Sequence, residues 1–527
     1  MLPIFEPELR RAAILELPDA PNCRVIKIAV HRNHAFETIA SVLSKFLGFS
    51  GLRSECVFSS YDDALGFAET DGADLHILFI DCAHYHDEIS AFLAERIAAL
   101  RAQSGAPIAV IYLAKNGEKV SVDLPTDSYI FAANEMISEL GAAAFDEAKT
   151  AYSGTRLSGK ANLAIARELG LRIIPALLLP ALKAVVFDLD NTLYDGVLGE
   201  DGIAALKPYL KVQAEAKRLL EAGFFVAIAS KNDERDAKEL FKIRTDFMLR
   251  FEDFSAYEIN WQPKRDNLQK IAKTLNIGID SMLFVDDNIA EITSVEPLGI
   301  HTIHADTPDH TLAQLRYFPR LMKLRKSAED GVRSRDIQAN KEREELAKEL
   351  TPKEYFKKLA IRLVFAVNDH SQIARVAELF GKTNQFILTY KRYSETETTA
   401  LMQGAASCVI TIAMSDKLSD SGVIAIVAAH NDGGTLVIDE LTVSCRALGR
   451  GIESVMLPFL FHLAAKKLGT TAAVKIGYKK GDRNAPALCW LAALSGESVD
   501  RLGDSGVIDY ETPAAIDTEG LEITVRD

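Results

Sequence analysis

The chain has 527 residues, of which 48% are hydrophobic and 25% charged, the composition of an ordinary globular protein of about three domains. Its net charge of −14 at pH 7 argues against nucleic acid or an anionic membrane as the main partner. Six scattered cysteines without a C-x-x-C spacing argue against a zinc site, and the lack of a signal peptide or a long apolar run predicts a cytoplasmic protein.

The first 180 residues alternate short apolar runs with amphipathic helical stretches. Strands are predicted at residues 25–30, 74–80 and 108–113, and helices at 35–47 and 88–103. This alternation predicts an α/β domain with a parallel sheet. His84 and His86 follow a strand end, and a pair of this kind is more often solvated than bound to a metal. We therefore expect a lid or docking role for residues 1–180, and a linker at 171–180.

The centre of the chain begins with an apolar strand that ends in Asp188 and Asp190. In an open α/β sheet, ligands bind beyond the carboxyl ends of the strands, so both acids lie where chemistry would take place. If the strand continued through both, their side chains would share one face. Such a pair stays ionised beside a cation, and Mg²⁺ takes one or two carboxylates while leaving room for a substrate phosphate. The alternative is a surface turn with two solvated aspartates.

Three later stretches favour the metal interpretation. Ser230 closes a second apolar run, Lys264 precedes a helix predicted at 266–275, and Asp286 and Asp287 close a third apolar run. The acids would hold the metal, the hydroxyl and the ammonium would bind phosphate oxygens, and the first aspartate could attack phosphorus. We therefore predict that residues 181–305 form a phosphoryl-transfer domain.

The order, spacing and strand context of these motifs resemble the haloacid dehalogenase (HAD) superfamily of phosphotransferases. The resemblance implies that Asp188 is the nucleophile, that Asp190 is the acid/base, and that Ser230 and Lys264 hold the phosphoryl group. It further implies that the Mg²⁺ ligands are Asp188, Asp190, Asp286 and Asp287. The substrate contacts that it implies are Asn191, Thr192 and Asn232.

The intervals between the motifs are too short for a lid domain. Residues 193–225 already need a turn and a helix near 209–222, and residues 232–260 are filled by one helix and one strand. A site without a lid is open to water unless another domain or a partner closes it. We therefore expect a large substrate, or one carried on a macromolecule.

Residues 306–350 predict a helical connector with a face rich in both charge signs. A third domain is predicted from residue 351, with helices at 371–380 and 452–468 and strands at 406–415, 423–430, 435–443 and 472–478. Asp432, Gly433 and Gly434 indicate a hairpin turn between two of these strands. A further helix is predicted through Trp490.

The loop before the second of these helices contains Arg446, Gly449, Arg450 and Gly451. Glycines let the backbone approach a ligand, and arginines at a helix start offer charge and free N–H groups to a phosphate. A plain helix start is the alternative. The loop resembles the acyl-CoA loop of GNAT acyltransferases, which implies a GNAT-like α+β domain over 351–527 and a site for acyl-CoA or phosphopantetheine.

Four segments together resemble the FkbH-like proteins (HAD subfamily IIIC), namely residues 188–193, 196–202, 382–386 and 444–451. The resemblance implies that 1,3-bisphosphoglycerate, a phosphorylated three-carbon acid, loses phosphate and that its glyceryl unit is loaded onto the phosphopantetheine arm of an acyl carrier protein, in polyketide or related secondary-metabolite biosynthesis. It also makes residues 1–180 similar in fold to SGNH hydrolases. The segment from His31 to His34 stands where their catalytic serine is expected, so we predict a non-hydrolytic domain.

Ala229 departs from the family pattern, because many relatives carry a cysteine at this position. An acyl thioester needs a thiol, so the chain would use Cys445, transfer the acyl group directly to the phosphopantetheine thiol, or act only as a phosphatase. The alternative function is a phosphatase or acyltransferase that acts on a small acyl phosphate or sugar-type intermediate without a carrier protein. A non-catalytic scaffold is a third interpretation, which the complete set of HAD residues argues against.

Overall fold

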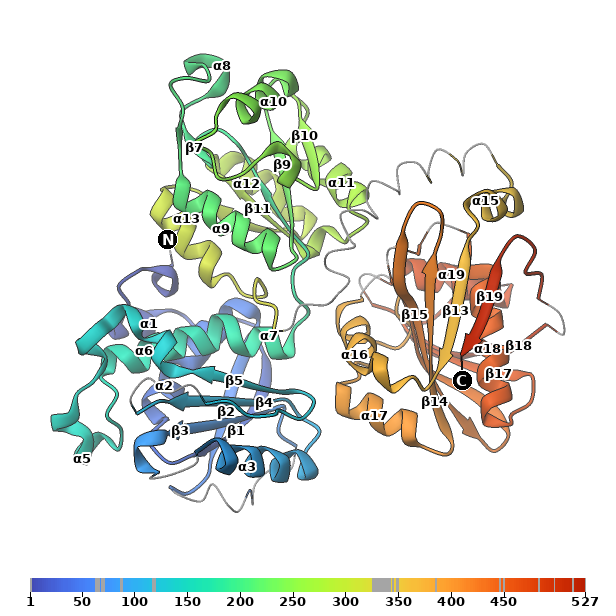
Figure 1. The fold of residues 1–527 in the computed structure, drawn as a ribbon, viewed down its shortest axis with the longest axis horizontal. Coiled ribbons are helices and arrows are strands. Elements are labelled where there is room, and N and C mark those ends of the chain that lie inside the picture. The colour runs from blue at the N-terminus through green and yellow to red at the C-terminus, as the bar shows by residue number, and fades with distance from the viewer. Residues whose placement is uncertain are drawn as a thin grey trace.

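The computed structural model describes residues 2–526 except 62–66, 68–71, 86–88, 116–119, 325–342, 344–345, 347–349, 384–385, 445–446, 449–450, 482–483, 497 and 514–515. Its large sheets form three layered α/β units that follow one another along the chain, blue to cyan, green to yellow, and orange to red (Figure 1). The predicted multidomain α/β class is confirmed.

The N-terminal sheet has five parallel strands in the order β2-β1-β3-β4-β5. Apolar side chains of α2 (Glu37–Leu47) and α6 (Gly159–Arg167) pack on one face, and those of α3 (Ile89–Gln103) pack on the other. The strands and the short helices are β1 (Arg24–Arg32), β2 (Leu52–Phe58), β3 (Leu75–Asp81), β4 (Ile108–Leu113), β5 (Ser128–Ala132), α1 (Arg11–Glu16), α4 (Ala133–Met136) and α5 (Thr150–Ser153).

The segment 171–180, predicted to link the first domain to the central strand, is helical for most of its length. The chain continues from α6 through a π-helical turn (Glu168–Ile173) into α7 (Ile174–Leu178). Pro175 lies directly after the π-helical turn, near the start of α7. Extended chain begins only at Leu179.

The central sheet also has five parallel strands, in the order β10-β9-β6-β11-β12. Its strands are β6 (Ala184–Phe187), β9 (Phe225–Ser230), β10 (Ala256–Ile259), β11 (Met282–Asp286) and β12 (His301–His304). One face is covered by α9 (Leu210–Glu221), α10 (Glu234–Ile243) and α13 (Pro308–Tyr317), and the other by α11 (Lys264–Thr274) and α12 (Ile289–Val295). β6 is the middle strand and is buried along its whole length.

The two intervals that were predicted to lack a lid domain hold only small elements. Residues 193–225 form a two-stranded ribbon of β7 (Tyr194–Asp195) and β8 (Lys207–Pro208), the short helix α8 (Leu198–Asp201), and α9. Residues 232–260 form α10, one 3₁₀ turn and β10. The carboxyl edge of the central sheet therefore has no covering domain of its own within these intervals.

The C-terminal sheet has seven strands in the order β18-β17-β16-β15-β14-β13-β19. Neighbours are antiparallel except for the parallel pairs β16 with β17 and β13 with β19. The strands are β13 (Arg362–Val367), β14 (Ser407–Ser415), β15 (Asp420–Asp432), β16 (Thr435–Val443), β17 (Ala473–Lys479), β18 (Ser505–Glu511) and β19 (Glu522–Arg526).

Helices cover both faces of this sheet. Apolar side chains of α16 (Ile373–Lys382) and α17 (Glu395–Gln403) pack on one face, and those of α15 (Pro352–Leu359), α18 (Glu453–Leu468) and α19 (Ala485–Ser495) belong to the larger core on the other. The predicted hairpin is confirmed, because Asp432 pairs with Thr435 across Gly433 and Gly434, which both have positive φ. None of the described helices combines the length and the apolar character needed to cross a bilayer.

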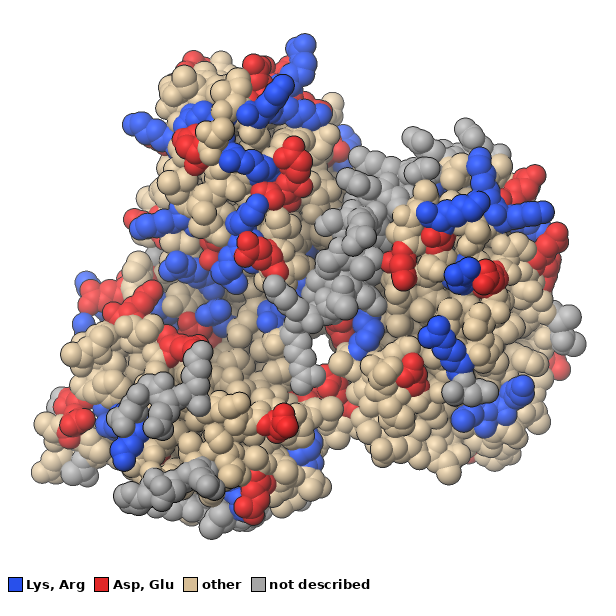
Figure 2. Space-filling view, in the orientation of Figure 1, with Lys and Arg blue, Asp and Glu red and all other residues tan. Residues whose placement is uncertain are grey.

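Several predicted features lie outside the described residues. These are His86, most of the connector at 306–350, and, in the predicted phosphate loop, Cys445, Arg446, Gly449 and Arg450. Gly451 is described and has a φ of +71°. On the face of the molecule shown in Figure 2, acidic and basic side chains are interspersed over all three units.

Candidate active site

The predicted site residues converge because three neighbouring strands of the central sheet end at the same edge. Asp188 directly follows β6, Ser230 is the last residue of β9, and Asp286 is the last residue of β11. β6 lies between β9 and β11, and all three run in the same direction. Lys264 is the first residue of α11, which begins near the end of β10.

Three carboxylates form the acidic centre of the site. Each of Asp188, Asp286 and Asp287 offers one oxygen, and these atoms all lie within 4.8 Å of one another. Asp286 is fully buried. Burial and the negative charge of Asp188 raise the pKa of Asp286 to about 6 and also raise the pKa of Asp287. Three crowded carboxylate oxygens are the hard donors that Mg²⁺ prefers, so the residues present fit this ion.

Lys264 is the cation that the chain itself supplies to this centre. Its Nζ lies 2.8 Å from Oδ2 of Asp188 and 2.6 Å from Oδ2 of Asp286, and the side chain is buried. Burial alone would disfavour the ammonium, but the two carboxylates outweigh it and raise the pKa of Lys264. Lys264 is therefore charged at neutral pH and offsets part of the repulsion among the acids.

The Asp190 carboxylate does not belong to the three-carboxylate group, because the strand does not continue through Asp188 and Asp190, which was the condition for their side chains to share one face. β6 ends at Phe187, and the chain turns at Asn191, which has a φ of +51°. The Asp190 carboxylate instead accepts hydrogen bonds from the Tyr194 hydroxyl (2.7 Å), the Leu198 N–H (3.0 Å) and the Asn232 amide (2.9 Å).

Tyr194 is a member of the site that the sequence motifs did not indicate. Burial and the charge of Asp190 strongly raise the pKa of Tyr194, so its hydroxyl keeps its proton and acts as the donor. The available signal was its position, four residues after Asp190, where a tight turn can bring the two side chains together. Tyr194 fixes the orientation of one Asp190 oxygen.

The remaining predicted residues border the same edge. Asn232 donates to Ser230 Oγ as well as to Asp190, over a distance of 3.0 Å, so it joins two of the predicted groups. The Asn191 side chain accepts from the Gly196 N–H and hydrogen-bonds Asp287. Thr192 is buried, and its hydroxyl has no hydrogen-bond partner among the described residues.

Two large apolar side chains at this edge are exposed. Trp261, shortly after β10, is 76% exposed, and Ile289, the first residue of α12, is 57% exposed. Each lies within three residues of a member of the site, namely Lys264 and Asp286. Both side chains therefore present apolar surface to the solvent after the carboxyl ends of β10 and β11.

No protein-family model matches the chain, and no curated protein matches it. Solved structures do match in parts. The N-terminal part of a Bacteroides fragilis protein, which contains a phosphatase domain and is complexed with Mg, is 21% identical with a TM-score of 0.47, and the match covers 58% of this chain and 96% of that chain.

Two further solved structures match single domains. A HAD-family enzyme from Bacteroides thetaiotaomicron, in complex with magnesium and inorganic phosphate, is 16% identical with a TM-score of 0.20, over 23% of this chain and 93% of that chain. The ribosomal-protein-S18-alanine N-acetyltransferase from Escherichia coli is 11% identical with a TM-score of 0.22, over 30% of this chain and 97% of that chain. All of these likenesses are distant.

Proposed function

We propose that the central domain is a Mg²⁺-dependent phosphatase or phosphotransferase of the HAD type. The observation that carries the proposal is the meeting of Asp188, Lys264, Asp286 and Asp287 at the carboxyl edge of one parallel sheet. Asp188, Asp286 and Asp287 would hold the ion. When bound, Mg²⁺ would neutralise these carboxylates and polarise a phosphoryl oxygen.

The chain's own residues supply the other parts of the reaction. The Asp188 carboxylate attacks phosphorus, the bond from phosphorus to the leaving oxygen breaks with its electron pair on that oxygen, and an aspartyl phosphate forms. The Ser230 hydroxyl and the Lys264 ammonium bind the phosphoryl oxygens. Asp190 then takes a proton from a water molecule that attacks the same phosphorus, which releases phosphate and restores Asp188.

The hydrogen bonds of Asp190 favour the hydrolysis of an acyl phosphate at phosphorus, which releases the free acid and so supports the alternative function without a carrier protein. All three of its partners donate to it, so in this arrangement Asp190 is an acceptor and suits the role of a base. An acyl phosphate leaves as a carboxylate, which needs no proton from the enzyme. An alkyl phosphate leaves as an alkoxide, which needs one.

The finer proposal is that 1,3-bisphosphoglycerate is the substrate and that its glyceryl unit passes to the phosphopantetheine thiol of an acyl carrier protein. The open carboxyl edge leaves room for a carried substrate, and exposed Trp261 and Ile289 offer apolar surface for a carrier. The chain has no cysteine between residues 181 and 305, and Ala229 is buried on β9. In this transfer the carrier thiolate attacks the C1 carbonyl carbon, and the bond from that carbon to the phosphate oxygen breaks, so that the C1 phosphate is the leaving group. The C3 phosphoryl group is the one that passes to Asp188 and then to water. Direct transfer to the carrier thiol needs no cysteine in this domain.

The cytoplasm is the proposed place of action. None of the described cysteines forms a disulfide bond, which fits a reducing compartment; they are Cys23, Cys56, Cys82, Cys408 and Cys489.

The test is a reaction of the full chain with Mg²⁺, 1,3-bisphosphoglycerate and a phosphopantetheinylated carrier protein, followed by intact mass measurement of the carrier. We expect the carrier to gain one glyceryl unit and phosphate to be released. The same carrier without its phosphopantetheine arm is the control and should gain nothing. Phosphate release without a gain in carrier mass would favour the alternative, a phosphatase on a small acyl phosphate or sugar-type intermediate.

A further inference from the structure

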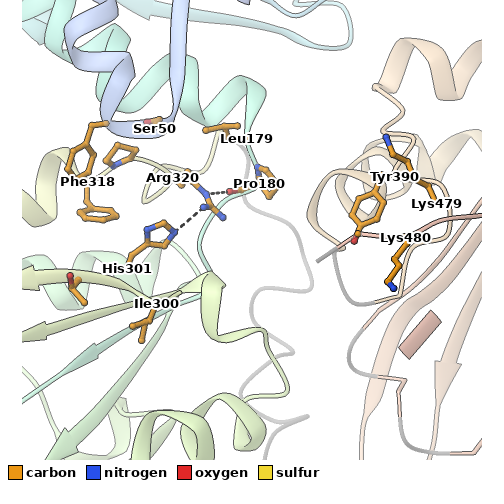
Figure 3. A pocket seen from close by; sticks show the side chains of 14 residues that line it. Ser50, Leu179, Pro180, Ile300, His301, Phe318, Arg320, Tyr390, Lys479 and Lys480 are labelled. Carbon is orange, nitrogen blue, oxygen red and sulfur yellow. Dashed lines mark hydrogen bonds between the residues drawn. The ribbon is translucent and has the colours of Figure 1, made fainter. Parts of the chain in front are cut away.

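A cavity of about 820 Å³ lies where residues of all three units approach one another (Figure 3). It is distinct from the acidic centre. β12 runs parallel to β11 so that His301, which lines the cavity, lies beside Leu283, whereas Asp286 lies beside His304. Three residue steps separate the two places, about 10 Å along the strands. The cavity thus lies at the amino ends of the strands of the central sheet, whereas the carboxylates lie at the carboxyl ends.

The charged side chains that line this cavity are all cationic. Arg320 approaches it from the segment after α13, and Lys479 and Lys480 approach it from the end of β17. No aspartate or glutamate is among the described residues that line it. In a chain with a net charge of −14, three cations around one cavity, with no carboxylate among the described residues that line it, indicate a site for an anion.

Arg320 is held in place by its neighbours. Its Nε donates to the Pro180 carbonyl at 2.6 Å, and its Nη1 lies 3.2 Å from Nε2 of His301, as Figure 3 shows. Burial and the charge of Arg320 lower the pKa of His301 to about 4, so the imidazole is neutral and can accept this hydrogen bond. Arg320 also has a φ of +71°, an uncommon conformation for a side chain of its size. Two of its five N–H donors are thereby used, and three remain for a ligand.

The walls of the cavity are largely apolar. In Figure 3, Leu179, Ile300 and Phe318 lie on the side of the first two units, and Tyr390 lies on the side of the C-terminal unit. Phe49 of the first unit also lines the cavity. The Tyr390 ring packs so closely on Gly481 that an added Cβ there would lie 2.5 Å from the Tyr390 hydroxyl oxygen. Cavities of this volume, with apolar walls and a few polar groups, are typical of small-molecule sites.

We propose that this cavity binds a small organic phosphate that carries two or more negative charges and an apolar or aromatic body, with Arg320, Lys479 and Lys480 as the groups that recognise the phosphates. The guanidinium offers a bidentate donor pair, and the two lysines add point charge. A ligand that contacts Arg320 and both lysines also holds the C-terminal unit against the other two.

The test uses calorimetric titration of the full chain with ADP and with inorganic pyrophosphate, in EDTA, so that the acidic centre has no Mg²⁺. Both probes should bind, and ADP should bind more tightly because its base can contact the apolar walls. The double variant Lys479→Ala/Lys480→Ala should bind ADP at least tenfold more weakly. Lys475→Ala, which removes an exposed lysine of the same strand outside the cavity, should bind ADP like the wild type.

Two further measurements separate this site from the acidic centre. Ser230→Ala, which removes a phosphate-binding group of that centre, should leave ADP affinity unchanged, and small-angle scattering should show a more compact chain when ADP is bound. The proposal is overturned if the double lysine variant binds ADP as well as the wild type does, or if Ser230→Ala abolishes binding. Equal affinity for ADP and pyrophosphate would overturn the proposal that the apolar walls contact the body of the ligand.

Discussion

Asp188 is the proposed nucleophile and also an ion-pair partner of Lys264. A single substitution can remove the nucleophile without preventing folding. One of the Asp188 oxygens accepts the Leu189 N–H at 2.7 Å, and the other pairs with Lys264. Asn has nearly the same shape and can still accept from Leu189, but it is not a nucleophile. Asp188→Asn should therefore lower turnover by about three orders of magnitude or more while leaving the thermal unfolding midpoint almost unchanged. Phosphate release and calorimetry check both, and near-normal turnover would show that the nucleophile is misassigned.

Lys264 makes the stability of the acidic centre depend on metal. Lys264→Met removes both ion pairs and leaves three crowded carboxylates without a cation, which should cost about 3–5 kcal/mol of unfolding free energy in EDTA. Mg²⁺ should restore much of this loss, so that the ion stabilises the variant more than the wild type. Chemical denaturation with and without Mg²⁺ measures the difference.

Lys270→Met is the matched control, because Lys270 lies on the same helix but is half exposed. Its ion pair with Glu258 is long, with 3.9 Å between Nζ and Oε2. Lys270→Met should change the unfolding free energy by less than about 1 kcal/mol. If Lys264→Met proves as mild as this control in EDTA, the three carboxylates do not repel one another as proposed.

His34 makes the N-terminal unit sensitive to acid. Its ring is stacked on Phe79 and its Nδ1 lies 2.9 Å from the Thr155 hydroxyl. Burial lowers the pKa of His34 from 6.5 to about 4, so between these pH values the unfolded chain binds a proton that the folded chain excludes. The stability contribution is complete above pH 6.5 and is lost as the pH falls towards 4. At pH 5 the loss from this residue is about 2 kcal/mol.

Hydrogen exchange of β1 and β3 at pH 7.5 and at pH 5 measures this effect. His34→Asn keeps a polar group near Thr155 but does not titrate, so its loss of stability between the two pH values should be smaller by about that amount. His76 and His301 have a pKa of about 4 for the same main reason and should act in the same direction. An equal loss in wild type and variant would remove His34 from the explanation.

Among the elements, the segment from Phe386 to Lys391, which follows α16, joins two strands of the C-terminal sheet. β16 and β17 pair only over three residues, from Leu436 with Val474 to Ile438 with Ile476. Beyond this, Phe386 accepts from the Val443 N–H of β16, and Leu388 accepts from the Lys479 N–H of β17. The segment therefore fills the gap between the two diverging strands.

Glu440 of β16 fixes this segment in place. It is fully buried and accepts hydrogen bonds from the backbone N–H groups of Leu388, Thr389 and Lys391 and from the Thr389 hydroxyl. Glu440→Ala leaves these donors buried without an acceptor and should cost about 3 kcal/mol or more. Thermal unfolding followed by the fluorescence of Trp490 measures this loss.

Glu522→Ala serves as the comparison. Glu522 lies on the edge strand β19 and forms an exposed ion pair with Arg362, so its loss should cost less than about 1 kcal/mol. If both variants unfold at the same temperature, Glu440 does not hold the segment in the gap.

Across the whole molecule, the open edge of the central sheet is the feature that a carrier protein would meet. Trp261→Ala should raise the KM for a carrier-bound substrate by about tenfold, since exposed aromatic residues often dominate interface energies. It should leave hydrolysis of a small aryl phosphate unchanged, because the Trp261 side chain is largely exposed to solvent and a small substrate needs no surface outside the catalytic groups. Ile243→Ala removes a side chain that is 54% exposed at the far end of α10 and should change neither quantity. An equal effect on both substrates would assign Trp261 to the catalytic centre instead.

Much of this arrangement can be predicted without coordinates. The runs before Asp188, Ser230 and Asp286 are apolar because parallel strands are buried on both faces, and the ends of such strands share one edge. The bounds of β4 and β16 match their predicted ranges. The edge strand β2 is partly exposed, and its sequence lacks a continuous apolar run, so periodicity does not indicate it.

The direction in which a side chain points after a strand ends depends on the turn that follows. The turn at Asn191 directs Asp190 to Tyr194 and Asn232 and away from the three carboxylates, and no periodic pattern predicts it. The cavity at the amino ends of the strands is likewise formed by Pro180, His301, Arg320 and Lys480, which are far apart in the chain. Local sequence patterns report burial and strand ends, whereas contacts between distant segments arise only when the domains pack.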